Sequence, residues 1–173
     1  MNSSFGARRS TRQICQKSDD QFDMDVILFF FQLQGCKAIW LQLLNDSSHK
    51  KYLATIGDAC LRLFVVKELA LRGIQTSGQL SCSSQRYLTN SQLALLGSKL
   101  HLSAALGSAR HCTLSKRTVA TTVEALIGAG EMHLSGANTQ GVVLNIMHFL
   151  DNCGETSAVK CCHRYPHAST LVR

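Results

Sequence analysis

The spacing of apolar residues along the central part of the chain predicts a series of amphipathic helices. From Lys51 to Arg72 apolar positions recur at intervals of three and four, and Gly73 is placed to end this helix. The same periodicity predicts further helices over residues 86–106, 114–134 and 138–151, the last opened by Asn138 or Thr139 as its cap; a Ser/Gly-rich connector is expected over 73–85. Since no stretch of useful length alternates apolar and polar residues, we predict an all-α fold.

The most apolar part of the chain lies ahead of these helices, over residues 25–44. Three glutamines, Gly35 and Lys37 interrupt it, so it is a poor match to the ~20 apolar residues of a membrane span, and no membrane partner is expected. We expect instead one buried helix, or two short helices broken at Gly35. Residues 45–49, NDSSH, supply N-cap residues for a helix that opens near Lys50.

Composition sets the domain organisation. The 173 residues are 45% hydrophobic and include one proline, which suits a single helical domain with short tails. We divide the chain into a basic N-terminal arm (1–18), an N-terminal helical layer (19–49), a main helical domain (50–151) and a C-terminal tail (152–173).

Positive charge is concentrated in two places. Residues 50–131 hold ten Lys or Arg and four acids, within a chain of formal net charge +7. This excess suits a polyanionic partner such as nucleic acid or anionic lipid, although a basic surface without a specific partner has the same composition. Residues 1–18 contain four basic residues, several serines and no acid, as in mitochondrial or plastid transit peptides. A basic arm of an intracellular protein of the cytoplasm or nucleus, with or without RNA contacts, is the alternative.

Eight cysteines are scattered along the chain, and no secretory signal segment accompanies them. We therefore expect buried free thiols in a reducing compartment rather than disulfides. The tail carries Cys153, Cys161, Cys162, His163 and His167, but their spacing matches no paired C-x-x-C zinc pattern. A loosely docked tail is the expectation.

Two of the few acids stand in small-residue surroundings, Asp58 in IGDAC and Glu124 in TVEAL. If their helices pack side by side, the two carboxylates could share one Mg²⁺ ion, which needs only one or two protein carboxylates beside its waters and substrate phosphate. Alternatively, each acid pairs with a nearby cation, Arg62 or Lys116.

Three segments, LATIGDACLRLFVVKELALRG, RYLTNSQLALLGSKL and TVATTVEALIGAGEMHL, resemble in order and spacing the core blocks of the ribonuclease III catalytic domain, over about residues 50–150. The resemblance implies that Asp58 and Glu124 bind Mg²⁺, or Mn²⁺ as a substitute, for phosphodiester hydrolysis in double-stranded or structured RNA. It also implies a homodimer, or a heterodimer with another ribonuclease III-fold subunit. Processing of ribosomal or other organellar precursor RNA would be the setting if the arm is a targeting signal.

The chain departs from the four-acid pattern of this family. Lys51 stands where the family has an additional glutamate near the subunit interface, and Ala54 and Thr121 stand at two of the four acid positions. The compact Mini-III branch has an alanine and a threonine at the last two positions, as in LATIGDA and ATTVEALIGA here. By that resemblance Thr121 would orient a metal-bound water, and Asn90, in the middle block, would cap the second helix and order the cleft. A catalytically silent ribonuclease III fold, serving as a ribosomal component or as partner of an active subunit, is the alternative.

Mini-III enzymes lack a separate double-stranded-RNA-binding domain, and only 22 residues follow Asp151 here. RNA binding is therefore expected from the basic surface of the catalytic domain itself, through contacts to phosphates and 2′-hydroxyls. The candidates are Arg86, Lys99, Arg110, Lys116 and Arg117. Upstream, residues 19–49 reproduce the family's T-H-x-S segment poorly, so this layer is expected to be divergent.

Overall fold

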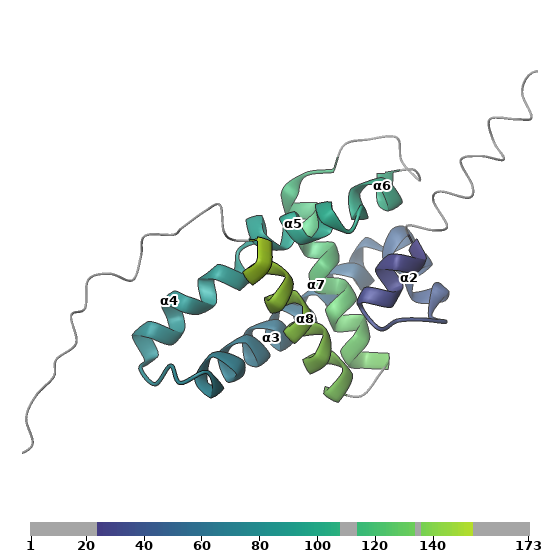
Figure 1. The fold of residues 1–173 in the computed structure, drawn as a ribbon. Coiled ribbons are helices and arrows are strands. Elements are labelled where there is room, and N and C mark those ends of the chain that lie inside the picture. Colours follow the sequence, from purple (N-terminus) through teal and green to yellow (C-terminus); the bar gives the residue numbers. More distant parts are fainter. Residues whose placement is uncertain (1–23, 108–113, 134–135, 154–173) are drawn as a thin grey trace, which may run out of the picture.

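The computed structural model describes residues 24–107, 114–133 and 136–153, and these form helices with no strand among them (Figure 1). The all-α prediction is confirmed. A helix over residues 24–30 comes first. It is followed by α2 (Lys37–Asn45), α3 (Ser47–Leu71), α4 (Ser77–Leu88), α5 (Asn90–Lys99), α6 (Leu102–Gly107), α7 (Lys116–His133) and α8 (Gly136–Cys153).

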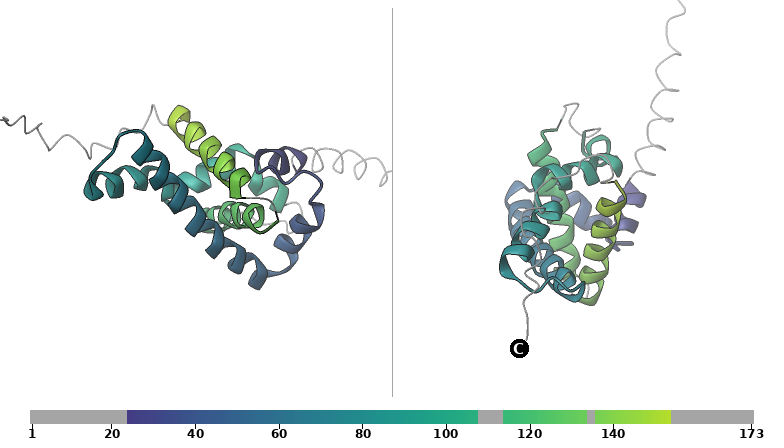
Figure 2. Two further views of the ribbon diagram at one scale, coloured as in Figure 1. Left: turned by 90° about the horizontal axis from the view of Figure 1, so that it is seen from below. Right: turned by 60° about the vertical axis from the view of Figure 1, so that its left-hand side comes forward.

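Helix α7 is the centre of the fold. Its buried positions run almost without a break from Val119 to Gly130, because neighbouring helices cover it on several sides. The long helix α3 crosses it, α5 packs on it from another direction, and α8 lies against both α3 and α7 (Figures 1 and 2). Helix α4 turns back beside α3 to form a helical hairpin at one end of the molecule.

The crossing of α3 and α7 depends on two glycines. A Cβ atom at Gly57 would overlap the carbonyl oxygen of Glu124, and one at Gly128 would overlap that of Leu53. The two backbones are therefore in direct contact, an approach that side chains at these positions would prevent. Residues next to this contact are held close to the opposite helix.

The ends of α3 are set by local hydrogen bonds. The carboxylate of Asp46 accepts from the backbone N–H groups of Ser48 and His49 at 2.8 and 3.0 Å, so the helix begins at Ser47, a few residues before the predicted start near Lys50. At the other end Gly73 has φ +92° and the next residue, Ile74, donates to the carbonyl of Leu69 at 3.2 Å. This is the glycine-terminated helix end that the sequence predicted.

Two predictions between residues 73 and 106 are wrong. The expected connector contains helix α4, which Thr76 caps by accepting from the N–H of Gln79 at 3.3 Å. The expected single helix over 86–106 is broken at two places. Thr89 is extended (ψ 143°), which separates α4 from α5, and His101 has φ +54°, which separates α5 from α6. Packing of a few side chains against α3 stabilises α4 despite its polar sequence.

The N-terminal layer is folded from residue 24 onward. Gly35, with φ +82°, separates the first helix from α2, which confirms the break predicted there. Ile27, Phe31 and Trp40 are buried in the common core. None of the helices in the described ranges combines the length and the apolar character needed to cross a bilayer.

Helix α8 begins earlier than predicted, at Gly136, so neither Asn138 nor Thr139 is its cap. Thr139 is instead buried, and its hydroxyl oxygen has no hydrogen-bond partner among the described residues. Within those residues the four cysteines, Cys36, Cys60, Cys82 and Cys153, form no disulfide, as expected, but Cys82 is exposed and the others are only partly buried. The N-terminal arm, Arg110 and nearly all of the Cys/His tail lie outside the described residues.

Candidate functional site

The two predicted carboxylates flank the glycine contact between α3 and α7. Gly57 faces the backbone of Glu124, and Asp58 is the next residue along α3. Because Gly57 touches the backbone of Glu124, the neighbouring Asp58 lies beside the same crossing, and its charge acts on Glu124. The two helices pack side by side, which is the condition that the sequence set for a shared metal ion.

Glu124 is held in an unfavourable environment for a negative charge. Burial, and secondarily repulsion from the Asp58 carboxylate, raises the pKa of Glu124 to about 7. A cation bound between the two carboxylates would offset both the cost of burying the charge of Glu124 and its repulsion by Asp58. Strongly shifted acids of this kind are typical of functional sites, because a structural role is served better by a paired or neutral residue.

Asp58 has a partial counter-charge on its own helix. Nη2 of Arg62 lies 3.5 Å from Oδ1 of Asp58, and both side chains are about half exposed (58% and 46%). Such an exposed pair between residues four apart is weak, so it leaves Asp58 available to another cation. Glu124 forms no ion pair with Lys116 or with any other residue in the described part of the chain.

These two acids form a sparse donor set for a metal ion. No group of three or more His, Cys, Asp or Glu side chains suited to a metal occurs among the described residues. Mg²⁺ nevertheless keeps several waters and is often bound through one or two carboxylates, so the pair fits a site of this kind. Thr121, one turn before Glu124 and partly buried, would add a hydroxyl, whereas Ala54, one turn before Asp58, is buried at 6% exposure and adds no donor.

Asn90 does not have the capping role expected of it. The N-cap of α5 is Thr89, and Asn90 is the first helical residue, with an exposed side chain. The hydroxyl of Thr89 lies 3.0 Å from that of Ser91 and makes no capping bond. The sequence placed the cap one residue too late because both Thr and Asn are good caps.

The predicted RNA-binding cations differ in how far nearby carboxylates neutralise their charge. Nη2 of Arg86 lies 3.4 Å from Oδ1 of Asp151, and its guanidinium stands 5.9 Å from the centre of the Tyr87 ring. Asp151 also accepts from the Tyr87 hydroxyl at 2.7 Å and from Arg72 at 3.2 Å. Arg86 therefore belongs to a network that joins α3, α4 and α8, and its charge is partly neutralised.

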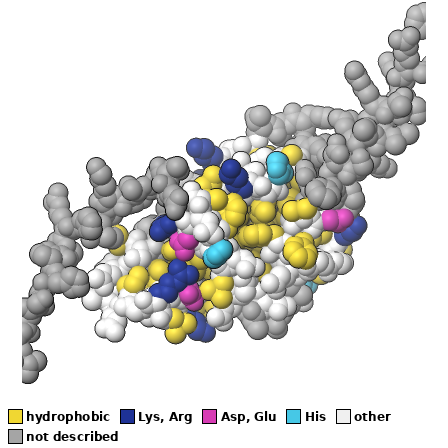
Figure 3. Space-filling view, in the orientation of Figure 1, with side chains coloured by type: hydrophobic (Ala, Val, Ile, Leu, Met, Phe, Trp, Pro, Cys, Tyr) yellow, Lys and Arg dark blue, Asp and Glu magenta, His cyan; other side chains and the backbone are white. Residues whose placement is uncertain are grey.

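The other three cations that the structure describes are on more open surface. Lys99 lies at the end of α5, and Lys116 and Arg117 open α7; all three are exposed. Figure 3 shows one face of the molecule, on which acidic side chains lie beside Lys or Arg while other Lys and Arg side chains stand apart from any acid.

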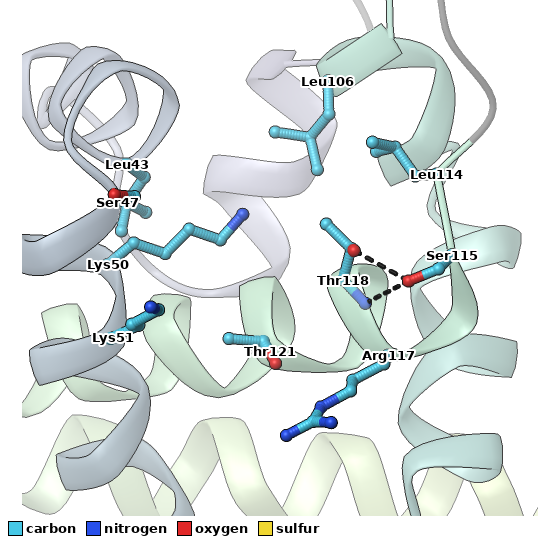
Figure 4. A pocket seen from close by; sticks show the side chains of 10 residues that line it. All are labelled: Leu43, Ser47, Lys50, Lys51, Leu106, Leu114, Ser115, Arg117, Thr118 and Thr121. Atoms are coloured by element: carbon cyan, nitrogen blue, oxygen red, sulfur yellow. Dashed lines mark hydrogen bonds between the residues drawn. The ribbon is translucent and has the colours of Figure 1, made fainter.

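Next to the acids is a cavity that sequence reasoning did not find. It has a volume of about 340 Å³ and lies between the start of α3, the start of α7, α2 and α6 (Figure 4). Thr121 lines it, together with Lys50, Lys51 and Arg117. Lys51 and Thr121 stand at positions where the ribonuclease III pattern has acids. In the sequence, this was the only indication that the two residues face one site.

Comparison with known families gives one match: residues 51–133 match the model of the ribonuclease III domain. The matched segment runs from the second turn of α3 to the end of α7 and so contains both acids, the glycine contact and most of the cavity lining. Neither the curated proteins nor the solved structures gave a match to the chain.

Proposed function

We propose, from the premise that residues 51–133 form a ribonuclease III domain, that the protein is a metal-dependent endoribonuclease acting on double-stranded or structured RNA. The observation that carries this proposal is the placement of Asp58 and Glu124 beside the glycine contact, where burial and, secondarily, the charge of Asp58 raise the pKa of Glu124 to about 7. The two-acid site and the residues Ala54 and Thr121 favour the Mini-III branch within that family.

In this mechanism the two helices act as a rigid frame for the carboxylates. Asp58 and Glu124 would hold Mg²⁺, or Mn²⁺ in its place, and the bound ion would supply an activated water and offset charge on the phosphate. Glu124 would bind the ion as an ionised group, because a cation would offset the cost of burying its charge and its repulsion by Asp58. Thr121, one turn before Glu124 on α7, would orient a water, and Arg62 would moderate the charge of Asp58.

The test is cleavage of a double-stranded RNA by the purified protein with Mg²⁺. Asp58→Asn should lower the cleavage rate by about 10³-fold or more, because it removes one of two metal-binding groups without changing side-chain volume. Glu68→Gln is the matched control: this acid is on the same helix but is engaged with Arg72 at 2.9 Å, so cleavage should be unchanged. Absence of cleavage by the unaltered protein, at any Mg²⁺ or Mn²⁺ concentration, contradicts the proposal.

A second candidate function is favoured by one specific observation. The positions of two lost acids, Lys51 and Thr121, line a cavity that bears cations instead of carboxylates. A ribonuclease III fold that binds RNA as a ribosomal or complex subunit without cutting it would have such a site. It is the function to adopt if the protein binds RNA in a gel-shift assay and leaves it intact.

We propose further that α3 mediates self-association, or pairing with another ribonuclease III-fold subunit. Tyr52 and Leu63 are 54% and 62% exposed and stand eleven residues apart, on one face of the helix that also bears Ala59. Leu63→Glu should shift the protein to monomer in sedimentation-velocity experiments, because a charge would be buried at the contact. Leu41→Glu, at an equally exposed position on α2 (57%), should not. A monomer in the unaltered protein, or an equal effect of both variants, contradicts this role for α3.

The N-terminal arm supports an organellar setting only by its composition. Four basic residues and no acids over residues 1–18 are typical of mitochondrial or plastid targeting. We therefore propose ribosomal or other organellar precursor RNA as the substrate class.

A further inference from the structure

Three kinds of side chain line the cavity beside the acids: basic, hydroxyl-bearing and apolar. Lys50 and Lys51 enter from the first turns of α3 and Arg117 from the first turn of α7. The hydroxyl-bearing residues Ser115, Thr118 and Thr121 lie along α7 and at its start, and Leu43, Leu106 and Leu114 supply apolar surface. In Figure 4 Lys50 extends into the opening from one side, while Leu106 points into it from the opposite wall. The volume of about 340 Å³ is in the range of small-molecule sites.

Among the described residues, no acid lines this cavity, and two of the cations that line it have no counter-charge. Neither Lys51 nor Arg117 forms an ion pair within the part of the chain that the structure describes. Elsewhere in that part, Arg62, Arg72 and Arg86 all pair with carboxylates. Positive charge therefore accumulates at the cavity, and an anion would be attracted to it.

The hydrogen-bonding groups at the helix starts are partly taken by the protein itself. Asp46 accepts from the first amides of α3, and Oγ of Ser115 accepts from the N–H of Thr118 at 3.1 Å. Donors for an anion must therefore come mainly from side chains: the Lys51 ammonium, the Arg117 guanidinium and the hydroxyl of Thr121. Two cationic groups and a hydroxyl around one opening are a donor set suited to a phosphate.

We propose that this cavity binds a nucleotide unit, with its phosphate at Lys51 and Arg117 and its ribose or base against the leucine side chains. A bare phosphate would leave the apolar wall exposed, whereas a nucleotide covers both kinds of surface. The unit is either a free mononucleotide or an unpaired nucleotide of an RNA strand. This site lies one to two helical turns from Asp58 and Glu124 and does not need them to hold a metal, so it is independent of cleavage.

Isothermal titration calorimetry with adenosine 5′-monophosphate, adenosine and inorganic phosphate tests the proposal on the full chain. Adenosine 5′-monophosphate should bind about tenfold or more tightly than either part alone. Lys51→Met and Arg117→Met keep the aliphatic stem and remove the charge, and each should weaken binding of the monophosphate about tenfold. Lys67→Met is the matched control: it is an exposed lysine of the same helix α3 that does not line the cavity, and binding should be unchanged.

Competition separates the two sources of the nucleotide. A short single-stranded RNA that displaces the monophosphate assigns the cavity to an RNA strand, and failure to displace it assigns the cavity to a free nucleotide. Asp58→Asn should still bind the monophosphate, which distinguishes this site from the metal pair. Absence of monophosphate binding at millimolar concentration, or binding that neither Lys51→Met nor Arg117→Met weakens, overturns the proposal.

Discussion

Replacing Gly57 by alanine is expected to destabilise the fold by about 3 kcal/mol. The new Cβ would overlap the carbonyl oxygen of Glu124 and lie 2.7 Å from the carbonyl carbon and 2.9 Å from the amide nitrogen of Gly128. These are backbone atoms, so no side-chain rotation relieves the clash and α3 and α7 must move apart. Urea denaturation followed by circular dichroism measures the loss.

Gly78→Ala is the matched control for this substitution. Gly78 also lies in a helix, α4, but a Cβ there meets no atom within 4 Å. Alanine at this exposed helical site should raise stability by ~0.5–1 kcal/mol, since it lowers the entropy of the unfolded chain. Equal stabilities of Gly57→Ala and the unaltered protein would show that α3 and α7 do not cross in backbone contact.

The helices at the centre of the fold could be predicted because several features of their sequences indicate the same helices. In α7 the apolar positions Val119, Val123, Leu126 and Ile127, which follow the helical period, are all buried. In α3 the helix and its glycine end agree with the prediction and the start differs by a few residues, but the buried face runs through Leu61, Val65 and Leu69, and Leu63 is exposed. A strong period over several turns leaves little freedom for another structure.

The elements that the sequence did not predict are those whose structure depends on contacts with residues distant along the chain. Helix α4 has the composition of a loop, and its stability comes from Leu80 and Tyr87 packing against the rest of the fold. The breaks at Thr89 and His101 carry no local sign in the sequence, because neither proline nor glycine marks them. Sequence patterns report local preference, and such contacts between elements override it.

The candidate site was likewise predictable only in part. Asp58 and Glu124 stood out because acids are scarce and both have small neighbours, one of which, Gly57, turned out to be the contact itself. The cavity could not be predicted, since its walls come from α2, α3, α6 and α7 and its lysines look like ordinary surface residues in the sequence. The network of Arg86 with Asp151 joins residues 65 positions apart and was hidden for the same reason.

Glu124→Gln is expected to abolish cleavage and, in the metal-free protein, to raise stability by about 1 kcal/mol near pH 8. The folded protein raises the pKa of Glu124 from its ordinary 4.5 to about 7, through burial first and the Asp58 charge second. A raised acid pKa favours the folded state only while the group is protonated. Wild-type stability should therefore fall as pH rises from about 4.5 to about 7, and glutamine removes this loss.

Thermal unfolding with a chelator present, near pH 5 and near pH 8, measures the effect. Near pH 5 Glu124 is mostly protonated in the fold, so the variant and the wild type should differ little; near pH 8 the variant should unfold at the higher temperature. Asp58→Asn should act in the same direction but less, because the main cause, burial of Glu124, remains. Adding Mg²⁺ should stabilise the wild type and not Glu124→Gln, since the ion binds the ionised pair. A variant less stable than wild type near pH 8 would contradict this prediction, because it would mean that a favourable contact holds the ionised Glu124 in the fold.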